Sequence, residues 1–76
     1  MMLIFCSVTK HGQPVTSQTE VDEAVRQVNP AAEPSQDEGD GLWSVDLGAR
    51  EESKLERFGS LDIALPNGVR FEAEMP

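Results

Sequence analysis

The stretch "SLDIALPNGVRFEAEM", residues 60–75, places two runs of alternating apolar and polar residues on either side of Pro-Asn-Gly at 66–68. Asn-Gly often forms a two-residue hairpin loop, but here that loop would pair Ile63 with Glu72. A three-residue loop over 66–68 shifts the register by one position and pairs Ile63 with Phe71 instead. Proline fits the first central position of a type I turn, and glycine fits the left-handed residue that closes the loop. The sequence therefore predicts a β-hairpin with a three-residue loop and one apolar face.

The opposite face of this hairpin is charged. It carries Asp62, Glu72 and Glu74 together with Arg70. Like charges that face each other on neighbouring strands are mildly destabilising. Either water and the nearby Arg70 offset this repulsion, or the face meets basic groups on a partner. The alternation of the sequence is compatible with both interpretations.

The N-terminal residues 2–9 predict a central strand, because both of their alternating faces are apolar. One face holds Leu3 and Phe5, and the other holds Met2, Ile4, Cys6 and Val8. A turn or loop is expected over residues 10–14, which read Lys-His-Gly-Gln-Pro.

Residues 18–28 predict an amphipathic helix. Its apolar stripe, at helical spacing, consists of Val21, Ala24, Val25 and Val28. Ser17 is the expected N-cap because Glu20 follows three residues later, and Thr19 is an alternative N-cap. Asn29, which tolerates a left-handed cap, and the proline after it are expected to end the helix.

The segment at about 30–41 contains four carboxylates and no basic residue. These carboxylates are Glu33, Asp37, Glu38 and Asp40. Prolines and glycines interrupt any regular pattern here, so the sequence predicts an exposed, mobile acidic loop.

The stretch after this acidic loop returns to alternation. Trp43, Val45 and Leu47 are predicted to face a core, whereas Ser44 and Asp46 are predicted to face water. The alternative for Trp43 is a partly exposed anchor for a partner, since tryptophan is enriched at the energetic centres of interfaces.

Residues 50–58 allow two structures. The first is a short helix with Leu55 and Phe58 on one side and an ion pair between Glu51 and Lys54. The second is a charged hairpin loop that leads into the next strand.

These elements predict a small single α+β domain over residues 1–76. One amphipathic helix would pack on a mostly antiparallel sheet that ends in the C-terminal hairpin. The strand order is not predicted. The expected core partners of the helix are Trp43, Ile63, Leu65 and Phe71.

The composition limits the partners of the chain. A net charge of −8, from fourteen acidic and six basic residues, disfavours direct binding to nucleic acid, because such affinity comes largely from Lys and Arg that neutralise phosphates. Anionic membranes would repel the chain for the same reason. The apolar N-terminal run is too short for a membrane span or a signal peptide. With a lone cysteine, these features predict a cytoplasmic protein.

Few side chains offer catalytic or metal-binding chemistry. The single cysteine, Cys6, excludes an internal disulfide, and Cys6 and His11 together cannot supply the usual four zinc ligands. Cys6 is expected to be a small buried residue and His11 an exposed turn residue, so nucleophilic catalysis by this pair is not expected. The acidic stretch 37–41 lacks the alternating oxygen ligands of an EF-hand calcium loop. The sequence predicts no cofactor, no metal and no enzymatic activity.

The function that we expect from these features is non-enzymatic. A small acidic protein of this kind would bind another protein, as an inhibitor or modulator that covers a basic surface. The alternative is a structural or assembly subunit that self-associates through a sheet edge, for example as a homodimer. The candidate partner-binding residues are Glu33, Asp37, Glu38, Asp40, Trp43, Asp62, Glu72 and Glu74.

Overall fold

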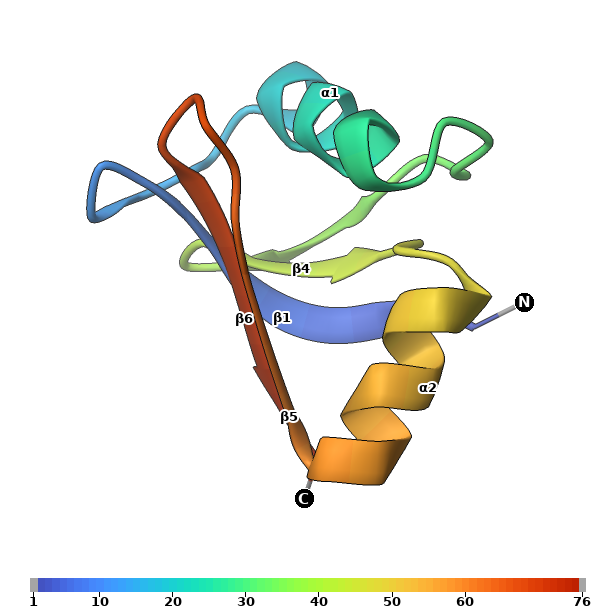
Figure 1. Ribbon diagram of the computed structural model, residues 1–76. Coiled ribbons are helices and arrows are strands. Elements are labelled where there is room, and N and C mark those ends of the chain that lie inside the picture. The colour runs from blue at the N-terminus through green and yellow to red at the C-terminus, as the bar shows by residue number, and fades with distance from the viewer. Residues whose placement is uncertain (1, 76) are drawn as a thin grey trace.

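The structure, a computed structural model that describes residues 2–75, has an α+β fold with two helices and an antiparallel sheet of six strands (Figure 1). Along the chain the elements are β1 (Ile4–Lys10), β2 (Gln13–Pro14), α1 (Gln18–Val28), β3 (Gln36–Gly39), β4 (Leu42–Val45), α2 (Ala49–Phe58), β5 (Ser60–Ala64) and β6 (Val69–Glu74). The predicted combination of helix and antiparallel sheet is confirmed. The expectation of one helix is wrong, because α2 is a second one.

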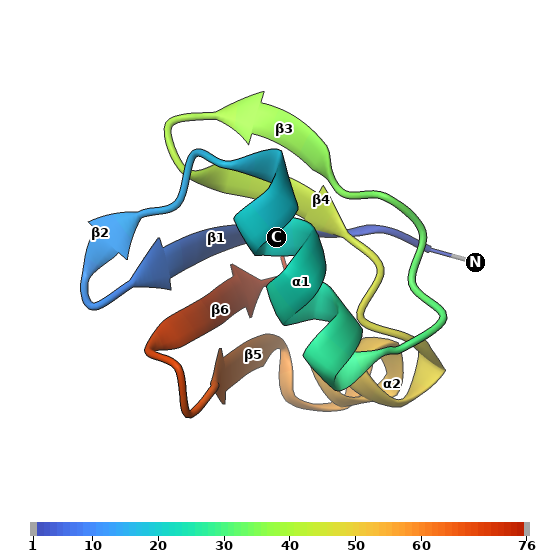
Figure 2. The ribbon, with the colours of Figure 1, turned by 90° about the horizontal axis from the view of Figure 1, so that it is seen from above.

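Strand β1 lies in the middle of the sheet. The strand order is β3-β4-β1-β6-β5, and β2 pairs only with the end of β1. Figure 2 shows the strands side by side, with α1 crossing over them. The prediction that residues 2–9 form a central strand is therefore confirmed, with bounds of 4–10 in the structure.

The C-terminal hairpin has the predicted register. Ile63 lies opposite Phe71, and the neighbouring apolar pair on the same face is Leu61 with Ala73. The three-residue loop is closed by a hydrogen bond of 2.8 Å from the Leu65 N–H to the Val69 carbonyl oxygen. In this loop Gly68 has a φ of 91°, which is the left-handed conformation that the turn chemistry required.

One face of the sheet carries the core. The strands contribute Ile4, Cys6, Val8, Trp43, Val45, Leu61, Val69, Phe71 and Ala73. Helix α1 contributes the predicted stripe, of which Val28 is only partly buried, and α2 contributes Leu55. The expected partners Ile63 and Leu65 belong to the same cluster but are partly buried.

The two helices share this covered face because the sheet twists strongly. Figure 1 shows β5 and β6 running steeply across β1, with α1 above β1 and β4 and α2 in the angle between β1 and the lower part of the hairpin. Each large apolar side chain that is fully buried stabilises the fold by about 1.5–3 kcal/mol relative to exposure. Both helices are therefore needed to cover one twisted apolar surface.

Helix α1 begins as predicted but ends differently. The Ser17 hydroxyl accepts a hydrogen bond of 3.3 Å from the Glu20 N–H, so Ser17 and not Thr19 is the N-cap. At the other end, Asn29 has a φ of −135°, so the expected left-handed cap is wrong. The Asn29 backbone is extended because the residue before a proline favours that conformation. Its side chain bonds to another segment of the chain.

That segment contains Asp46, which is buried, contrary to the expectation that it faces water. Its Oδ1 atom accepts a hydrogen bond of 3.3 Å from Asn29 Nδ2, and its Oδ2 atom accepts one of 3.1 Å from the Glu33 N–H. The Asp46 carbonyl oxygen also accepts from Asn29 Nδ2, at 3.2 Å. These bonds compensate the cost of burying the carboxylate and tie the end of α1 to the connection between β4 and α2.

The acidic segment at 30–41 is exposed along most of its length, but it is not a loop throughout. Residues 36–39 form strand β3, which pairs with β4 around a bulge between Asp37 and Gly39. The turn that follows has Asp40 at a φ of 55° and Gly41 at a φ of 76°. The prediction of an irregular loop is therefore wrong for its second half.

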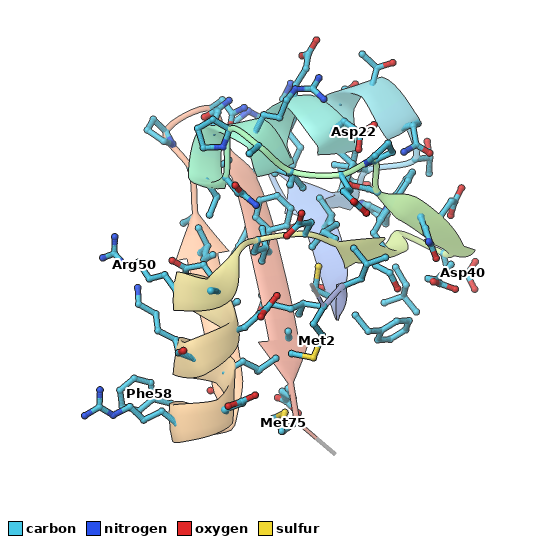
Figure 3. The ribbon with its side chains drawn as sticks, turned by 90° about the vertical axis from the view of Figure 1, so that its right-hand side faces the viewer. Met2, Asp22, Asp40, Arg50, Phe58 and Met75 are labelled. Atoms are coloured by element: carbon cyan, nitrogen blue, oxygen red, sulfur yellow. The ribbon has the colours of Figure 1, made fainter. Side chains whose placement is uncertain are left out.

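The structure selects the helical alternative for residues 50–58. Glu51 and Lys54 form the predicted pair, with 3.6 Å between Lys54 Nζ and Glu51 Oε2. Leu55 is buried, whereas the Phe58 side chain is 69% exposed. Figure 3 shows Phe58 in the last turn of α2, pointing away from the sheet.

We expect Gly41→Ala to destabilise the fold more than Gly12→Ala. Both glycines have a left-handed backbone, with φ values of 76° and 82°, which costs a non-glycine residue about 1–2 kcal/mol. A Cβ atom at Gly41 would lie 2.7 Å from the Cβ atom of Pro14, whereas a Cβ atom at Gly12 would meet no atom within 4 Å. The free energy of unfolding in urea should therefore fall by about 1–3 kcal/mol more for Gly41→Ala. An equal decrease in the free energy of unfolding for the two variants would contradict the close packing of Gly41 against Pro14.

Candidate functional site: the open face of the sheet

The face of the sheet opposite the core is the candidate site, and within residues 2–75 neither helix covers it (Figure 1). We name it the open face, and it consists of the outward side chains of β4, β1, β6 and β5: Phe5, Ser7, Thr9, Leu42, Ser44, Ser60, Asp62, Ala64, Arg70, Glu72 and Glu74. Polar and charged groups make up most of this surface. Such a polar surface is typical of the face of an antiparallel sheet that is exposed to water.

Phe5 is the largest exposed apolar side chain of the open face, where the apolar Leu42 is half-buried. Its side chain is 57% exposed although β1 is the central strand of the sheet. The apolar character of both faces of residues 2–9 suggested burial on both sides, but only the face of Ile4, Cys6 and Val8 is covered. The functional candidate that the sequence analysis missed is thus Phe5, and the signal was the second apolar face of this strand.

Arg70 is bonded to a carboxylate of the neighbouring strand. Its Nε atom donates to Asp62 Oδ1 at 2.8 Å, and its second guanidinium contact is to Asp62 Oδ2. The hydrogen bonds from Arg70, helped by its positive charge, hold the pKa of Asp62 below its ordinary value. The same bonds, with the charges of Asp62 and Glu72, raise the pKa of Arg70. Asp62 therefore has a cationic partner within the chain. This agrees with the interpretation in which Arg70 offsets the repulsion between the carboxylates of this face.

The other carboxylates of the open face are less completely paired. Glu72 Oε1 lies 3.8 Å from Arg70 Nε, which is beyond hydrogen-bonding distance. Glu38 accepts a hydrogen bond of 2.8 Å from the Ser44 hydroxyl, which brings a carboxylate of the edge strand β3 beside the open face. Glu74 is exposed at the end of β6. A shallow hollow near the pairing of β1 with β6 is lined by Ser7, Ser60, Leu61, Asp62, Glu72, Ala73 and Glu74.

The remaining acidic candidates do not join this surface. Asp37 Oδ1 accepts a hydrogen bond of 2.8 Å from the Gly39 N–H and so stabilises its own turn. Asp40 lies at the tip of the β3–β4 hairpin (Figure 3). Glu33 lies in the connection after α1, where its N–H binds Asp46. The structure therefore divides the predicted acidic residues among several places.

Trp43 cannot serve as a partner contact. Its side chain is 1% exposed, and its Nε1–H donates a hydrogen bond of 2.9 Å to the Val15 carbonyl oxygen. A large apolar ring whose polar group is satisfied inside the protein is typical of a core residue. The prediction that Trp43 faces the core is confirmed, and its inclusion among the partner-binding residues is wrong.

Cys6 and His11 lie in different environments. Cys6 is buried in the core, and burial raises the pKa of its thiol to about 12. His11 is exposed in the turn between β1 and β2, where its N–H donates to the Gly68 carbonyl oxygen at 3.1 Å. Among residues 2–75, no three His, Cys, Asp or Glu side chains are grouped so that they could hold a metal ion. Over the same residues, neither helix has the length and apolar character to cross a membrane.

The chain was compared with protein families, with curated proteins and with solved structures, and none of the three comparisons finds a match.

We expect Cys6 to be nearly inert in the folded protein. At about pH 8 its alkylation by iodoacetamide should be slower than in urea by a factor of at least about 100, because the reactive thiolate is both buried and scarce. Since the pKa is raised, the folded state holds the proton. The stabilisation that this provides is complete below the ordinary pKa of 9.0 and is lost as the pH rises toward about 12. Equal alkylation rates in the folded and unfolded protein would contradict the burial of this strand face.

Proposed function

We propose that the protein is a non-enzymatic binding protein whose open face contacts a protein partner with a basic surface. The observation that carries this proposal is the exposed ring of Phe5 on the central strand, on a face where three carboxylates, with a fourth beside them on β3, are accompanied by one guanidinium. The carboxylates are those of Glu38, Asp62, Glu72 and Glu74.

The aromatic ring and the carboxylates would have different roles. Full burial of a phenylalanine side chain is worth about 1.5–3 kcal/mol, so a partner that covers Phe5 gains affinity from it. The carboxylates would accelerate encounter with a basic surface and orient it, which affects the association rate more than the dissociation rate. The acidic turn at Asp40 would add to the long-range attraction without direct contact.

The resulting class of function is an inhibitor or modulator that acts by covering a basic surface of its partner. It requires no cofactor, and a chain with one buried thiol is suited to the reducing cytoplasm. The second candidate, an assembly subunit that self-associates, is supported by the free edge of β5.

We expect Phe5→Ser to abolish capture of the partner from host extracts, while Phe58→Ser leaves capture intact. Both side chains are exposed phenylalanines, but Phe58 lies at the end of α2 and points away from the sheet. Quantitative mass spectrometry of the captured proteins would compare the two variants with the unchanged chain. Equal loss in both variants, or no protein that depends on Phe5, would contradict the assignment of the open face.

We expect binding of the captured partner to depend on the carboxylates of β6. The double change Glu72→Gln with Glu74→Gln should lower the association rate about tenfold, because it removes charge from the contact surface. Glu23→Gln with Glu56→Gln changes the net charge equally on the exposed sides of the helices and should have a much smaller effect. Affinity should also fall as the salt concentration rises from about 0.05 to about 0.5 M, because screening shortens the range of attraction to a few Å. Salt-independent binding would exclude the electrostatic part of the proposal.

A further inference from the structure

The two edges of the sheet differ in how well they are protected from pairing with another chain. The edge strand β3 carries Asp37 and Glu38, ends at Gly39 and contains a bulge, all of which discourage strand addition. The edge strand β5 has no bulge in its pairing with β6 and no glycine. Its one charged residue, Asp62, is already bonded to Arg70 of the neighbouring strand. Figure 2 shows β5 at the margin of the sheet, and within residues 2–75 no strand pairs with its outer side.

The outer side of β5 presents backbone hydrogen-bonding groups. Leu65 donates its N–H to Val69 of β6. Hydrogen-bonded and non-hydrogen-bonded pairs alternate along an antiparallel ladder, so Leu61 and Ile63 also direct their backbone groups toward β6. The N–H and C=O groups of the alternate residues, Ser60, Asp62 and Ala64, therefore point to the free edge.

The core is incompletely covered at this same edge. Ile63 and Leu65 are only partly buried, whereas Phe71, which lies opposite Ile63 on β6, is fully buried. A strand added beside β5 would place apolar side chains against Ile63 and remove its remaining surface from water.

We propose that the occupant of this edge is a second copy of the chain, whose β5 pairs antiparallel with the first around a twofold axis at Asp62. In this register Ser60 of each copy lies opposite Ala64 of the other, and the outward backbone groups of both strands are satisfied. On the covered face, Ile63 of each copy packs beside Leu61 of the other. The pairing is thus self-complementary, as a twofold interface requires.

The pairing of Asp62 with Arg70 lowers the charge repulsion between two copies at this edge. The chain carries a net charge of −8, so most approaches of one copy to another bring carboxylates together. In the proposed register the two Asp62 side chains face each other across the axis, and the Arg70 bonded to each of them offsets part of the repulsion between them and from the neighbouring Glu72. An axis perpendicular to the sheet also leaves both open faces on the same side, which would present two Phe5 side chains to a partner. The inference itself does not depend on the proposed function.

The test is Ala64→Pro, studied by analytical ultracentrifugation over a range of concentrations. The Ala64 N–H points to the free edge, so a proline removes a bond to the second copy but none to β6, and edge strands tolerate proline there. We expect the unchanged chain and the control Ala64→Ser to dimerise with similar dissociation constants. The dissociation constant of the Ala64→Pro dimer should be at least tenfold higher. A strict monomer at all concentrations, or a dimer unaffected by Ala64→Pro, would overturn the proposal.

A second measurement keeps the proposal testable if Ala64→Pro does not fold. In a mixture of isotope-labelled and unlabelled unchanged chains, a filtered NOE should connect the Hα atoms of Leu61 and Ile63 in different copies, because non-hydrogen-bonded pairs bring these atoms together. A dimer that lacks this NOE would contradict the register. Added salt should strengthen the dimer by screening repulsion, whereas it should weaken binding to a basic partner, so the two proposals can fail separately.

Discussion

The register of the C-terminal hairpin is the constraint on which the rest of the structure depends. The three-residue loop at 66–68 places Ile63 and Phe71 on the same face as the core residues of β1 and β4. A slip of one residue would turn every side chain of one strand to the other face. Each large apolar side chain moved into water would cost about 1.5–3 kcal/mol. A domain of this size has a net stability of only about 3–5 kcal/mol, so the alternative register would not fold.

This register gives the sheet one covered face and one open face. Both helices lie on the covered side, and the chain has no third layer among the residues that the structure describes. The open side carries groups that water solvates well, namely hydroxyl groups, the pair of Asp62 with Arg70 and the carboxylates of Glu72 and Glu74. Phe5 does not fit that pattern, because burial would stabilise it and nothing in residues 2–75 covers it. The proposed function follows from this one uncovered ring in an acidic surface.

Local patterns in the sequence predicted most of the fold but only part of the site. The hairpin loop, the helix at 18–28 with its Ser17 cap and the central strand each follow from short-range chemistry. Strand β3 could not be predicted, because it is an edge strand exposed along its whole length and so shows no apolar alternation. The burial of Asp46 depends on Asn29 and on the Glu33 amide, which are distant in sequence. The exposure of Phe5 depends on the number of layers in the fold, which alternation within one strand does not reveal.

The most direct test of this account is the pattern of NOEs between Hα atoms across the C-terminal hairpin. Non-hydrogen-bonded pairs of an antiparallel ladder bring their Hα atoms close together. The three-residue loop predicts strong NOEs between Asp62 and Glu72 and between Ala64 and Arg70. NOEs that instead connect Ile63 with Glu72 would show the two-residue loop. That result would place apolar and charged side chains on the same face and would contradict both the one-sided core and the open face built on it.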